Sequence, residues 1–486
     1  MHNRQSAIIP FIILLYFFFH FISDLFYFLD FWKVVSQVIK YFFFTGLLYW
    51  IGFKIFQKKD HFTLAFSTML FFFLFYGVLM KTLVAIGVMK SFEVVTTKLL
   101  LSYLAICLLI VVLIFRLSKR KVVNLLRFWM IYCIILIVYD TAYLVFSTKE
   151  EKKYLTEKRK EEEIKLEKKP EIFFLLFDMY PSDSALKKYL HYDNSALNSF
   201  LKSKDFYVTG DARSLYAETY FSLGSTLDLV PLEYLKDKSI KSYKKNLLAL
   251  KNVKHSRLLE IFSTSGYDLR NYSVFDLQDQ PSPLSFSMKN HLDNILTSST
   301  FFNWMYYSFE TDFFKSNNNI NLGFLKTGWS TKVKSDVRFQ LDEFNKIVDD
   351  FSVSHRPAFN YFHFNMPHPP VLYDSAGNEL GIRDMYSFYG YERATNNFLN
   401  YIKYVNGEIK RMVESILKKK KKNVIIIIQG DHGYREFSNR FSQEMRFSIY
   451  NAVYLPDFNY NGFIDTMKPI QTFKKIMDNQ FNYRAK

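Results

Sequence analysis

Acidic and imidazole side chains follow two short apolar runs of the sequence. Ile172–Phe177 leads directly into Asp178, and Val424–Ile428 is followed two residues later by Asp431-His432-Gly433. A short, fully apolar run is typical of a strand buried on both faces. Functional residues of open α/β sheets gather at the carboxyl ends of such strands. Two carboxylates and an imidazole there could hold a divalent cation, although each acid alone could also be a turn former or helix cap.

The elements that must position these residues alternate between strands and helices. After Pro170 the pattern predicts strands over Ile172–Phe177, from Tyr267, over Ala358–Phe364, Val424–Ile428 and Ala452–Leu455, and helices over Ser182–Ser203, Ser256–Ser263 and Thr395–Leu417. Alternating elements with fully apolar strands predict an α/β domain with a mainly parallel central sheet. Residues 275–345 give no clear pattern. The expected catalytic domain spans residues 171–486.

The first 147 residues are of a different kind, because they consist mostly of long apolar runs. A spanning helix needs about 20 apolar residues. Five stretches approach this length and predict a transmembrane domain of five helices over residues 1–147: Ala7–Leu29, Val38–Phe56, Thr63–Met80, Leu99–Phe115 and Phe128–Phe146. The first stretch lacks a small-residue cleavage site and is expected to be a retained anchor. Three polar residues fall within or beside these apolar stretches, namely His20, Lys81 and Asp140. We expect their side chains to snorkel toward the membrane surface or to lie at the ends of the helices.

Loop charge predicts the orientation. One set of loops contains Arg4, Lys54, Lys58, Lys59, Arg116, Lys119, Arg120, Lys121 and Arg127, whereas the other set contains few basic residues. Basic loops favour the cytoplasm. We therefore expect a multi-pass protein of the inner (cytoplasmic) membrane, with a cytoplasmic N-terminus and an extracytoplasmic catalytic domain. The Lys- and Glu-rich residues 148–170 are expected to form a charged helical linker.

Composition excludes some other classes of protein. The 486 residues carry a net charge of +17, but the basic excess lies largely in loops between apolar stretches and in Lys418–Lys422, so we expect no nucleic-acid partner. Cys107 and Cys133 both lie within apolar stretches, which leaves no disulfide framework and no cysteine zinc site. Long apolar stretches exclude a wholly soluble enzyme, and the charge-rich second half excludes a bare channel.

Three sequence segments together carry a family resemblance. These are PEIFFLLFDMYPSD, YFHFNMPHPP and VIIIIQGDHG, which begin at Pro170, Tyr361 and Val424. They resemble the sulfatase-like membrane proteins of the alkaline phosphatase superfamily. A five-helix anchor followed by an outer catalytic domain is similar to the layout of lipoteichoic acid synthases and phosphoethanolamine transferases. The resemblance covers Pro170 to about Pro456 in order, and the membrane half matches only in layout.

The resemblance implies one divalent metal ion (Mn, Mg or Zn), with Asp178, Asp431 and His432 as ligands together with a Thr or Ser nucleophile. Thr219 occupies the position of that nucleophile in the segment SLYAETYFSLGSTLDL, where Ser222, Ser225 and Thr226 are competitors. A hydroxyl at the start of a helix could meet both a metal and the free amides that bind phosphate. An ordinary helix cap is the alternative.

Two histidines and an arginine complete the candidate site. His368 lies in Pro-His-Pro-Pro, and related enzymes keep a histidine here that binds substrate phosphate or protonates the leaving oxygen. His363 is a second candidate for substrate binding, with a hydrogen-bonded structural histidine as the alternative. Arg435 could pair with phosphate or simply lie on the surface.

Two differences from the motifs of the resembled superfamily restrict the possible functions. The sequence offers no recognisable second set of Asp and His ligands, so we expect one metal ion. It also lacks a Cys/Ser-x-Pro-x-Arg motif, which argues against an ordinary sulfatase.

The resemblance favours a transferase that moves phosphoglycerol or phosphoethanolamine from a phospholipid to a surface glycan or lipid through a phospho-threonine intermediate. A phosphodiesterase or atypical sulfatase-type hydrolase with the same site is the alternative. A non-catalytic membrane protein that binds polysaccharide is a third hypothesis, and the four candidate residues Asp178, Thr219, Asp431 and His432 argue against it.

The topology can be tested with a reporter that is active only outside the cytoplasm. Fused after Lys486, the reporter should be active, and fused at Lys119 it should be silent, because the loop charge bias puts Lys119 inside. Reporter activity in colonies measures the outcome. The reverse pattern would place the catalytic domain in the cytoplasm and contradict a surface acceptor.

Overall fold

The computed structural model describes residues 4–25, 29, 31–86, 97–156, 166, 168–285, 288, 299–302, 305, 329–349, 356–385, 390–419, 423–436, 443–481 and 483. The chain divides into two compact units. The first comprises Met1–Leu155 and Asn290–Asn317, and the second comprises Thr156–Lys289 and Asn318–Lys486. Each unit is described by itself below.

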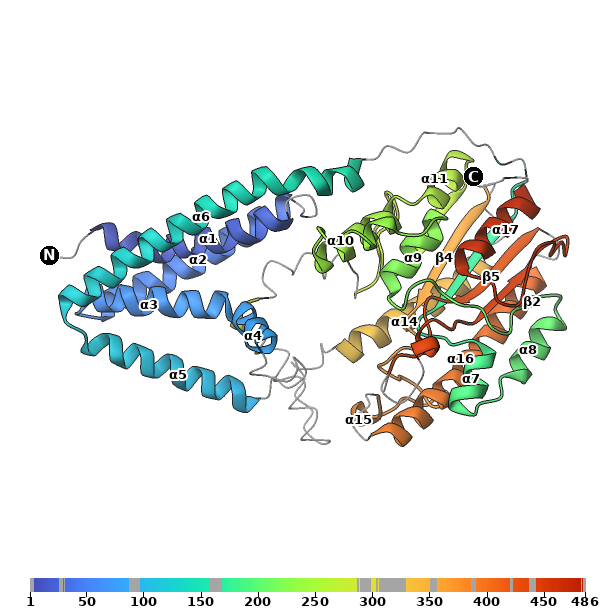
Figure 1. The fold of residues 1–486 in the computed structure, drawn as a ribbon. Coiled ribbons are helices and arrows are strands. Elements are labelled where there is room, and N and C mark those ends of the chain that lie inside the picture. Colours follow the sequence, from blue (N-terminus) through green and yellow to red (C-terminus); the bar gives the residue numbers. More distant parts are fainter. Residues whose placement is uncertain are drawn as a thin grey trace. The chain divides into compact units, whose positions relative to one another are not determined.

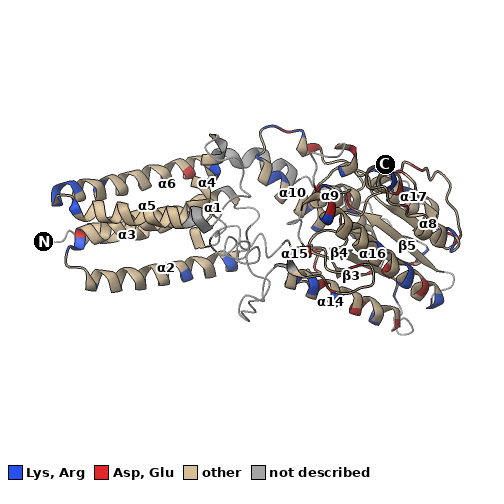
Figure 2. Ribbon diagram, turned by 90° about the horizontal axis from the view of Figure 1, so that it is seen from below, with Lys and Arg blue, Asp and Glu red and all other residues tan. Residues whose placement is uncertain are grey.

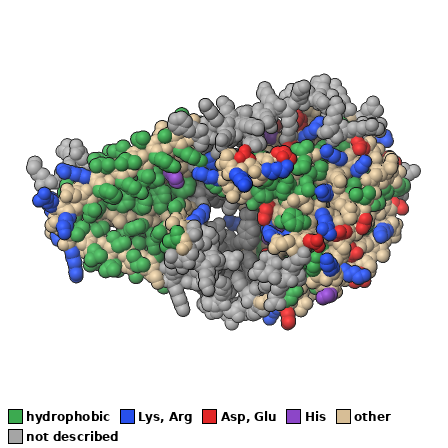
Figure 3. Space-filling view, viewed as in Figure 1, with side chains coloured by type: hydrophobic (Ala, Val, Ile, Leu, Met, Phe, Trp, Pro, Cys, Tyr) green, Lys and Arg blue, Asp and Glu red, His purple; other side chains and the backbone are tan. Residues whose placement is uncertain are grey.

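The first unit is built of apolar helices (Figure 1). In chain order they are η1 (Arg4–Ile8), α1 (Ile9–Leu25), α2 (Phe31–Ile55), α3 (Lys59–Leu74), α4 (Tyr76–Ala85), α5 (Thr97–Arg116) and α6 (Lys119–Thr156). Large apolar side chains such as Trp32, Leu108 and Tyr139 are exposed on its surface. Figure 3 shows hydrophobic side chains over most of the visible face of these helices. Such a surface is suited to lipid rather than to water.

Three stretches among the described residues are long and apolar enough to cross a membrane, namely Ser6–Ser23, Phe31–Ile55 and Lys119–Val145. Helices α3 and α4 meet at a bend of 61° and count as a fourth span at most, and the apolar part of α5 is shorter. Each of the five predicted stretches therefore contains helix, but the predicted count of five spans is not confirmed. Basic side chains gather at the end of this unit that holds the N-terminus (Figure 2).

One polar pair inside this unit connects two helices. His20 Nδ1 on α1 lies 3.0 Å from Asp140 Oδ2 on α6, and the Asp140 residue is buried. These two residues therefore join helices, rather than showing the end effects expected from the sequence. A segment from far along the chain also belongs to this unit. Phe301 packs edge-on against Phe73 and Tyr76, and the Gly77 amide donates to the Ser299 carbonyl.

The second unit is an α/β domain around one six-stranded sheet (Figure 1). Its strands are β1 (Glu171–Phe177), β2 (Tyr207–Val208), β3 (Asp268–Tyr272), β4 (Ala358–Phe364), β5 (Val424–Gly430) and β6 (Asn451–Tyr454). The order across the sheet is β2-β6-β5-β1-β4-β3. All pairings among β5, β1, β4 and β3 are parallel, and β6 is antiparallel to both of its neighbours. The predicted, mainly parallel sheet is confirmed.

Helices cover both faces of the sheet, and alternate residues of β1 supply the two cores. Phe173, Leu175 and Phe177 pack in one core, while Ile172, Phe174 and Leu176 pack in the other. The first core receives α7 (Asp183–Leu190), α8 (Ser195–Lys202), α14 (Trp329–Asp349) and α16 (Tyr391–Lys419), and the second receives α9 (Thr219–Asp228), α11 (Arg257–Thr264) and α17 (Pro469–Phe481). The remaining helical elements of this unit are η4 (Glu233–Leu235), α10 (Ser242–Lys254), α15 (Ile382–Met385) and η7 (Gln443–Arg446).

One predicted helix is divided. The pattern over Ser182–Ser203 predicted a single helix, but α7 ends where His191 adopts a left-handed backbone (φ 51°) and α8 begins at Ser195. The Ser182 hydroxyl caps α7 by accepting from the Ala185 amide.

Candidate metal centre

The sheet register brings the predicted acids together. Strand β1 lies between β4 and β5, and Phe177 pairs with both Phe364 and Gly430. The next residues along β1 and β5 are Asp178 and Asp431, so both acids leave the sheet side by side at its carboxyl edge. His363 on β4 is opposite Leu176, one position before that edge.

Four buried ligand atoms face one another in this corner. His432 Nε2 lies 3.4 Å from Asp178 Oδ1 and 3.5 Å from Asp431 Oδ2, and His363 Nε2 lies 3.6 Å from Asp178 Oδ2. The atoms Asp178 Oδ1, His363 Nε2, Asp431 Oδ2 and His432 Nε2 are buried and have no hydrogen-bond partner among the described residues. An unpaired buried polar atom costs about 1–3 kcal/mol. Ligand atoms of Asp178, His363 and Asp431 lie within 4.8 Å of one another, and His432 Nε2 lies beside both carboxylates, so a metal ion could satisfy these buried atoms.

Hydrogen bonds hold the other end of each ligand. The Asp431 Oδ1 atom accepts from the Met179 and His432 amides at 2.9 and 2.8 Å. His432 Nδ1 lies 2.8 Å from the Gly433 carbonyl, which can only accept, so Nδ1 carries the proton and Nε2 keeps its lone pair for a metal. The hydroxyl of Tyr361 lies 3.3 Å from His363 Nδ1 and can fix that ring in the same way.

The charge state of Asp178 also suits a cation. Burial by itself would raise the pKa of this carboxyl, but His368, His363 and His432 outweigh burial and lower the pKa below its usual range. Asp178 is therefore an ionised ligand at neutral pH. Burial raises the pKa of Tyr361 well above its ordinary value, with the charges of Asp431 and Asp178 adding to the effect, so this phenol stays protonated.

Two glycines permit the close backbone approach that this corner needs. A Cβ at Gly430 would lie 2.3 Å from the Tyr180 carbonyl oxygen, and one at Gly433 would lie 1.9 Å from the Met445 carbonyl oxygen. Met179 adopts a positive φ of 63°, which is unusual for its residue type. Its amide is one of the two donors to Asp431, so the strained turn contributes directly to the ligand geometry.

Helix α9 begins with Thr219 and is tied to the same corner. The Ser222 hydroxyl donates to the Asp431 carbonyl at 2.6 Å, which places the first turn of α9 beside the candidate metal ligands. The hydroxyls of Ser225 and Thr226 donate to the Ser222 carbonyl. Within the described residues the Thr219 hydroxyl makes no such bond. This contrast favours Thr219 over its three competitors as a nucleophile.

A charged group lies at the start of α9. The Arg435 guanidinium donates to Glu218 at 2.9 Å and to His368 Nε2 at 3.2 Å, while Arg446 Nη2 lies 3.7 Å from Glu218. The His368 Nδ1 atom donates to the Pro369 carbonyl, so Nε2 is the acceptor for Arg435. The His368 amide in turn donates to the Asp178 carbonyl at 3.1 Å.

Of the predicted site residues, Asp178, His363, Asp431 and His432 lie together at one corner of the sheet. Thr219, His368 and Arg435 are linked to this corner through neighbouring contacts. The contacts of His363 differ from those expected. His363 was predicted to bind substrate, whereas its Nε2 points at Asp178 within the candidate ligand group, which comprises Asp178, His363 and Asp431. Sequence reasoning missed Glu218 and Arg446. For Glu218 the sequence offered one signal, which is its position directly before the candidate nucleophile. For Arg446 it offered none, because this residue lies in no motif.

Comparison with known proteins supports the same relationship. The family model described as Sulfatase matches residues 230–461, which include β3, β4 and β5. Residues 230–461 are thus similar to a sulfatase domain, in agreement with the resemblance found in the sequence. Asp178 and Thr219 precede the matched residues, so their assignment depends on the geometry described above. No curated protein matches the chain.

Several solved structures are similar in part. Lipooligosaccharide phosphoethanolamine transferase A (EptA) from Neisseria meningitidis is 12% identical, with a TM-score of 0.39 over 97% of this chain and 94% of that one. The C-terminal periplasmic domain of phosphoethanolamine transferase EptC from Campylobacter jejuni is 11% identical, with a TM-score of 0.39 over 64% of this chain and 89% of that one. The corresponding domain of EcEptC from Escherichia coli, in complex with Zn, is 12% identical, with a TM-score of 0.38 over 65% and 84%.

The ligand assignment predicts a selective loss of metal. Asp431→Ala or His432→Ala should remove the bound divalent ion and the activity, because each deletes one of the few buried ligand atoms of this corner. Elemental analysis of the purified protein measures the metal, and circular dichroism verifies the fold. His368→Ala is the matched control, which should keep its metal. Full metal content in both Asp431→Ala and His432→Ala would show that the site is misplaced.

The glycine at the turn predicts a loss of folding. Gly433→Ala should destabilise the domain by several kcal/mol, because the new methyl group would collide with a backbone oxygen that cannot move aside cheaply. Thermal unfolding measures the change. In the control Gly407→Ala, the methyl group on helix α16 meets nothing within 4 Å, and stability should be unchanged or slightly raised. Equal melting temperatures for the two variants would contradict the crowded turn.

Proposed function

We propose that this chain is a membrane-anchored, metal-dependent transferase. It moves a phospho-alcohol group, phosphoglycerol or phosphoethanolamine, from a membrane phospholipid to a cell-surface glycan or lipid. The observation that carries the proposal is a group of buried ligand atoms on Asp178, His363, Asp431 and His432, which have no hydrogen-bond partner among the described residues and lie beside the helix that begins at Thr219. The apolar helices of the first unit support a donor that resides in the bilayer.

Asp178, Asp431 and His432 hold one divalent ion in this proposal, with Thr219 as the nucleophile that completes its ligands. His363 faces the same point from β4 and is available as a further ligand. When bound, the ion supplies positive charge that stabilises the nucleophile and the phosphoryl oxygens. Two carboxylates with imidazole nitrogens suit Mn or Zn better than Mg, which prefers oxygen ligands.

The reaction has two steps at the residues of this corner. The Thr219 oxygen attacks phosphorus, a Thr219–phosphorus bond forms, and the bond from phosphorus to the diacylglycerol oxygen breaks. His368 takes the proton of the Thr219 hydroxyl and passes it to that leaving oxygen. The acceptor hydroxyl then attacks the phospho-threonine and loses its proton to His368, which returns that proton to the Thr219 oxygen as the phosphorus–Thr219 bond breaks. Arg435 pairs with the phosphate oxygens, which it reaches from its position between Glu218 and His368.

A hydrolase with the same residues is the second candidate, and the match to the sulfatase family model favours it. Water would then replace the acceptor in the second step. The two functions are separated by incubating the purified protein with labelled phosphatidylglycerol and phosphatidylethanolamine, with and without a glycan acceptor. A transferase releases diacylglycerol and labels the glycan, whereas a hydrolase releases a free phospho-alcohol at the same rate in both cases.

The nucleophile assignment predicts how three variants behave. Thr219→Ala should keep its metal but lose turnover to near background, because no covalent intermediate can form. Thr219→Ser should keep part of the activity, because the hydroxyl survives. Ser225→Ala is the matched control on the same helix and should remain active, since its hydroxyl donates only to a backbone carbonyl. Mass spectrometry of protein quenched with donor lipid should find phosphate on Thr219.

The same experiment can overturn the assignment. A label on Ser222 or Ser225 would retain the two-step chemistry and move the nucleophile. Full activity of Thr219→Ala with no labelled peptide would eliminate the covalent step and favour direct attack by water.

A further inference from the structure

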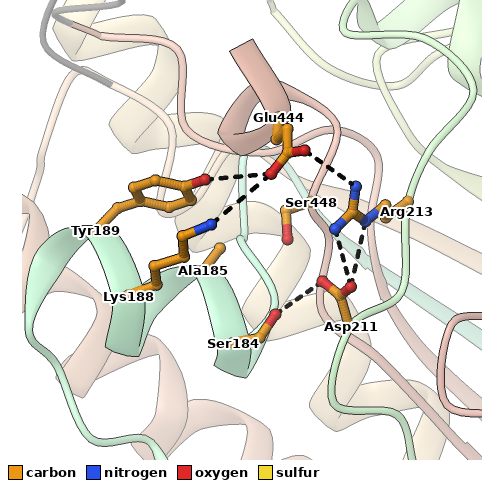
Figure 4. Close-up of a pocket in the computed structure, with 8 residues that line it drawn as sticks. All are labelled: Ser184, Ala185, Lys188, Tyr189, Asp211, Arg213, Glu444 and Ser448. Atoms are coloured by element: carbon orange, nitrogen blue, oxygen red, sulfur yellow. Dashed lines mark hydrogen bonds and ion pairs between the residues drawn. The ribbon is translucent and has the colours of Figure 1, made fainter. Parts of the chain in front are cut away.

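A polar cavity lies in the α/β unit, and the proposed reaction does not use its lining residues. Its volume is about 220 Å³. Figure 4 shows its walls, where Lys188 and Tyr189 on α7 face Glu444, and Asp211 and Arg213 lie on the opposite side beside Ser184. The cavity is lined by two cations and two carboxylates, so its net charge is zero while its polarity is high.

Each wall of the cavity belongs to a segment that also supplies a site residue. Ser184, Lys188 and Tyr189 follow Asp178 after β1. Asp211 and Arg213 follow β2 in the segment that leads to Thr219. Glu444 lies in the segment that begins with Asp431 after β5. The cavity is therefore at the same carboxyl edge of the sheet as the candidate metal centre, where ligands of open α/β sheets bind.

The two carboxylates of the cavity have different surroundings. Asp211 is held at short range by the Arg213 Nε and Nη2 atoms, at 3.2 and 3.0 Å, and by the Ser184 hydroxyl at 2.8 Å. Three donors of the cavity wall lie around Glu444 at longer range. The Tyr189 hydroxyl lies at 3.3 Å, the Lys188 Nζ atom at 3.9 Å and the Arg213 Nη1 atom at 4.0 Å.

This arrangement of donors suits an anion larger than one carboxylate oxygen. The two ion pairs to Glu444 are long, and its side chain is 54% exposed, so water weakens both pairs. A tetrahedral or carboxylate anion in the cavity could receive all three donors at hydrogen-bond distance and displace Glu444 into solvent. Asp211 would remain paired with Arg213 and would keep that guanidinium in place.

We propose that this cavity is a subsite for an anionic group, a phosphate or a carboxylate, on the acceptor, with Lys188, Tyr189 and Arg213 as its donors and Glu444 as the displaceable carboxylate. The proposal rests on the transferase function argued above. Glu444 and Arg446 lie two residues apart on η7, and Arg446 pairs with Glu218, which immediately precedes Thr219. The helix that contains Glu444 is therefore linked through Arg446 to the residue before the candidate nucleophile.

Inorganic phosphate is the probe for the test, titrated calorimetrically into the metal-loaded full chain in detergent. Wild type should bind phosphate in this cavity in addition to the candidate metal centre. Lys188→Ala should weaken the cavity site by about tenfold through the loss of a charge-assisted donor. Glu444→Gln should tighten it several-fold, because the competing negative charge is gone. Lys187→Ala, the neighbouring exposed lysine that does not line the cavity, is the matched control and should behave as wild type.

A second measurement identifies the source of the anion. Transfer is followed with a phosphorylated glycolipid acceptor and with its dephosphorylated counterpart. Lys188→Ala should raise the KM for the phosphorylated acceptor alone and leave donor cleavage without acceptor unchanged. If phosphate binding responds to the variants while both KM values stay constant, the cavity binds free phosphate and the acceptor assignment is wrong.

Equal phosphate affinity in wild type, Lys188→Ala and Glu444→Gln would overturn the subsite altogether. The calorimetric result does not depend on turnover, so a failure of the proposed transferase reaction would appear separately, as absent transfer with an intact cavity site.

Discussion

The buried approach of two carboxylates is the constraint on which the α/β unit depends. The ligand atoms of Asp178, His363 and Asp431 all lie within 4.8 Å of one another. Two unit charges at that separation repel by about 3 kcal/mol at the effective dielectric constant of about 20 that describes protein sites. Several neighbouring features are explained by the need to offset this repulsion. These are the imidazoles that lower the pKa of Asp178, the two amides that donate to Asp431, and the four atoms left open for a cation.

The fold maintains this arrangement because it is built around the central strand. Strand β1 is buried along its whole length and pairs with β4 and β5, which carry the other ligands. Its two faces contribute to both cores, so a change in register would disrupt packing on both sides of the sheet as well as the ligand geometry. The glycines at 430 and 433 then allow the chain to cross carbonyl groups at distances that a side chain would prevent.

The sequence predicted those parts of the site that depend on local pattern. Continuous apolar runs identified β1, β4 and β5, and the residues after β1 and β5 identified the acids. Other features depend on contacts that no local pattern contains. The division between α7 and α8 depends on the left-handed backbone of His191, and β2 has only two residues. The orientation of His363 toward Asp178 follows from strand pairing, and the convergence of Arg435 and Arg446 on Glu218 follows from tertiary packing.

The protonation pattern of the histidines separates their roles more clearly than their positions do. His432 and His368 both use Nδ1 to donate to a backbone carbonyl, so both present a lone pair on Nε2. For His432 that lone pair faces two carboxylate oxygens, an arrangement that is repulsive until a cation lies between them. For His368 the lone pair faces the Arg435 guanidinium, which already satisfies it. The first ring therefore presents its lone pair to the candidate metal site, whereas the lone pair of the second ring accepts from Arg435, so the two histidines have different surroundings although both lie near Asp178.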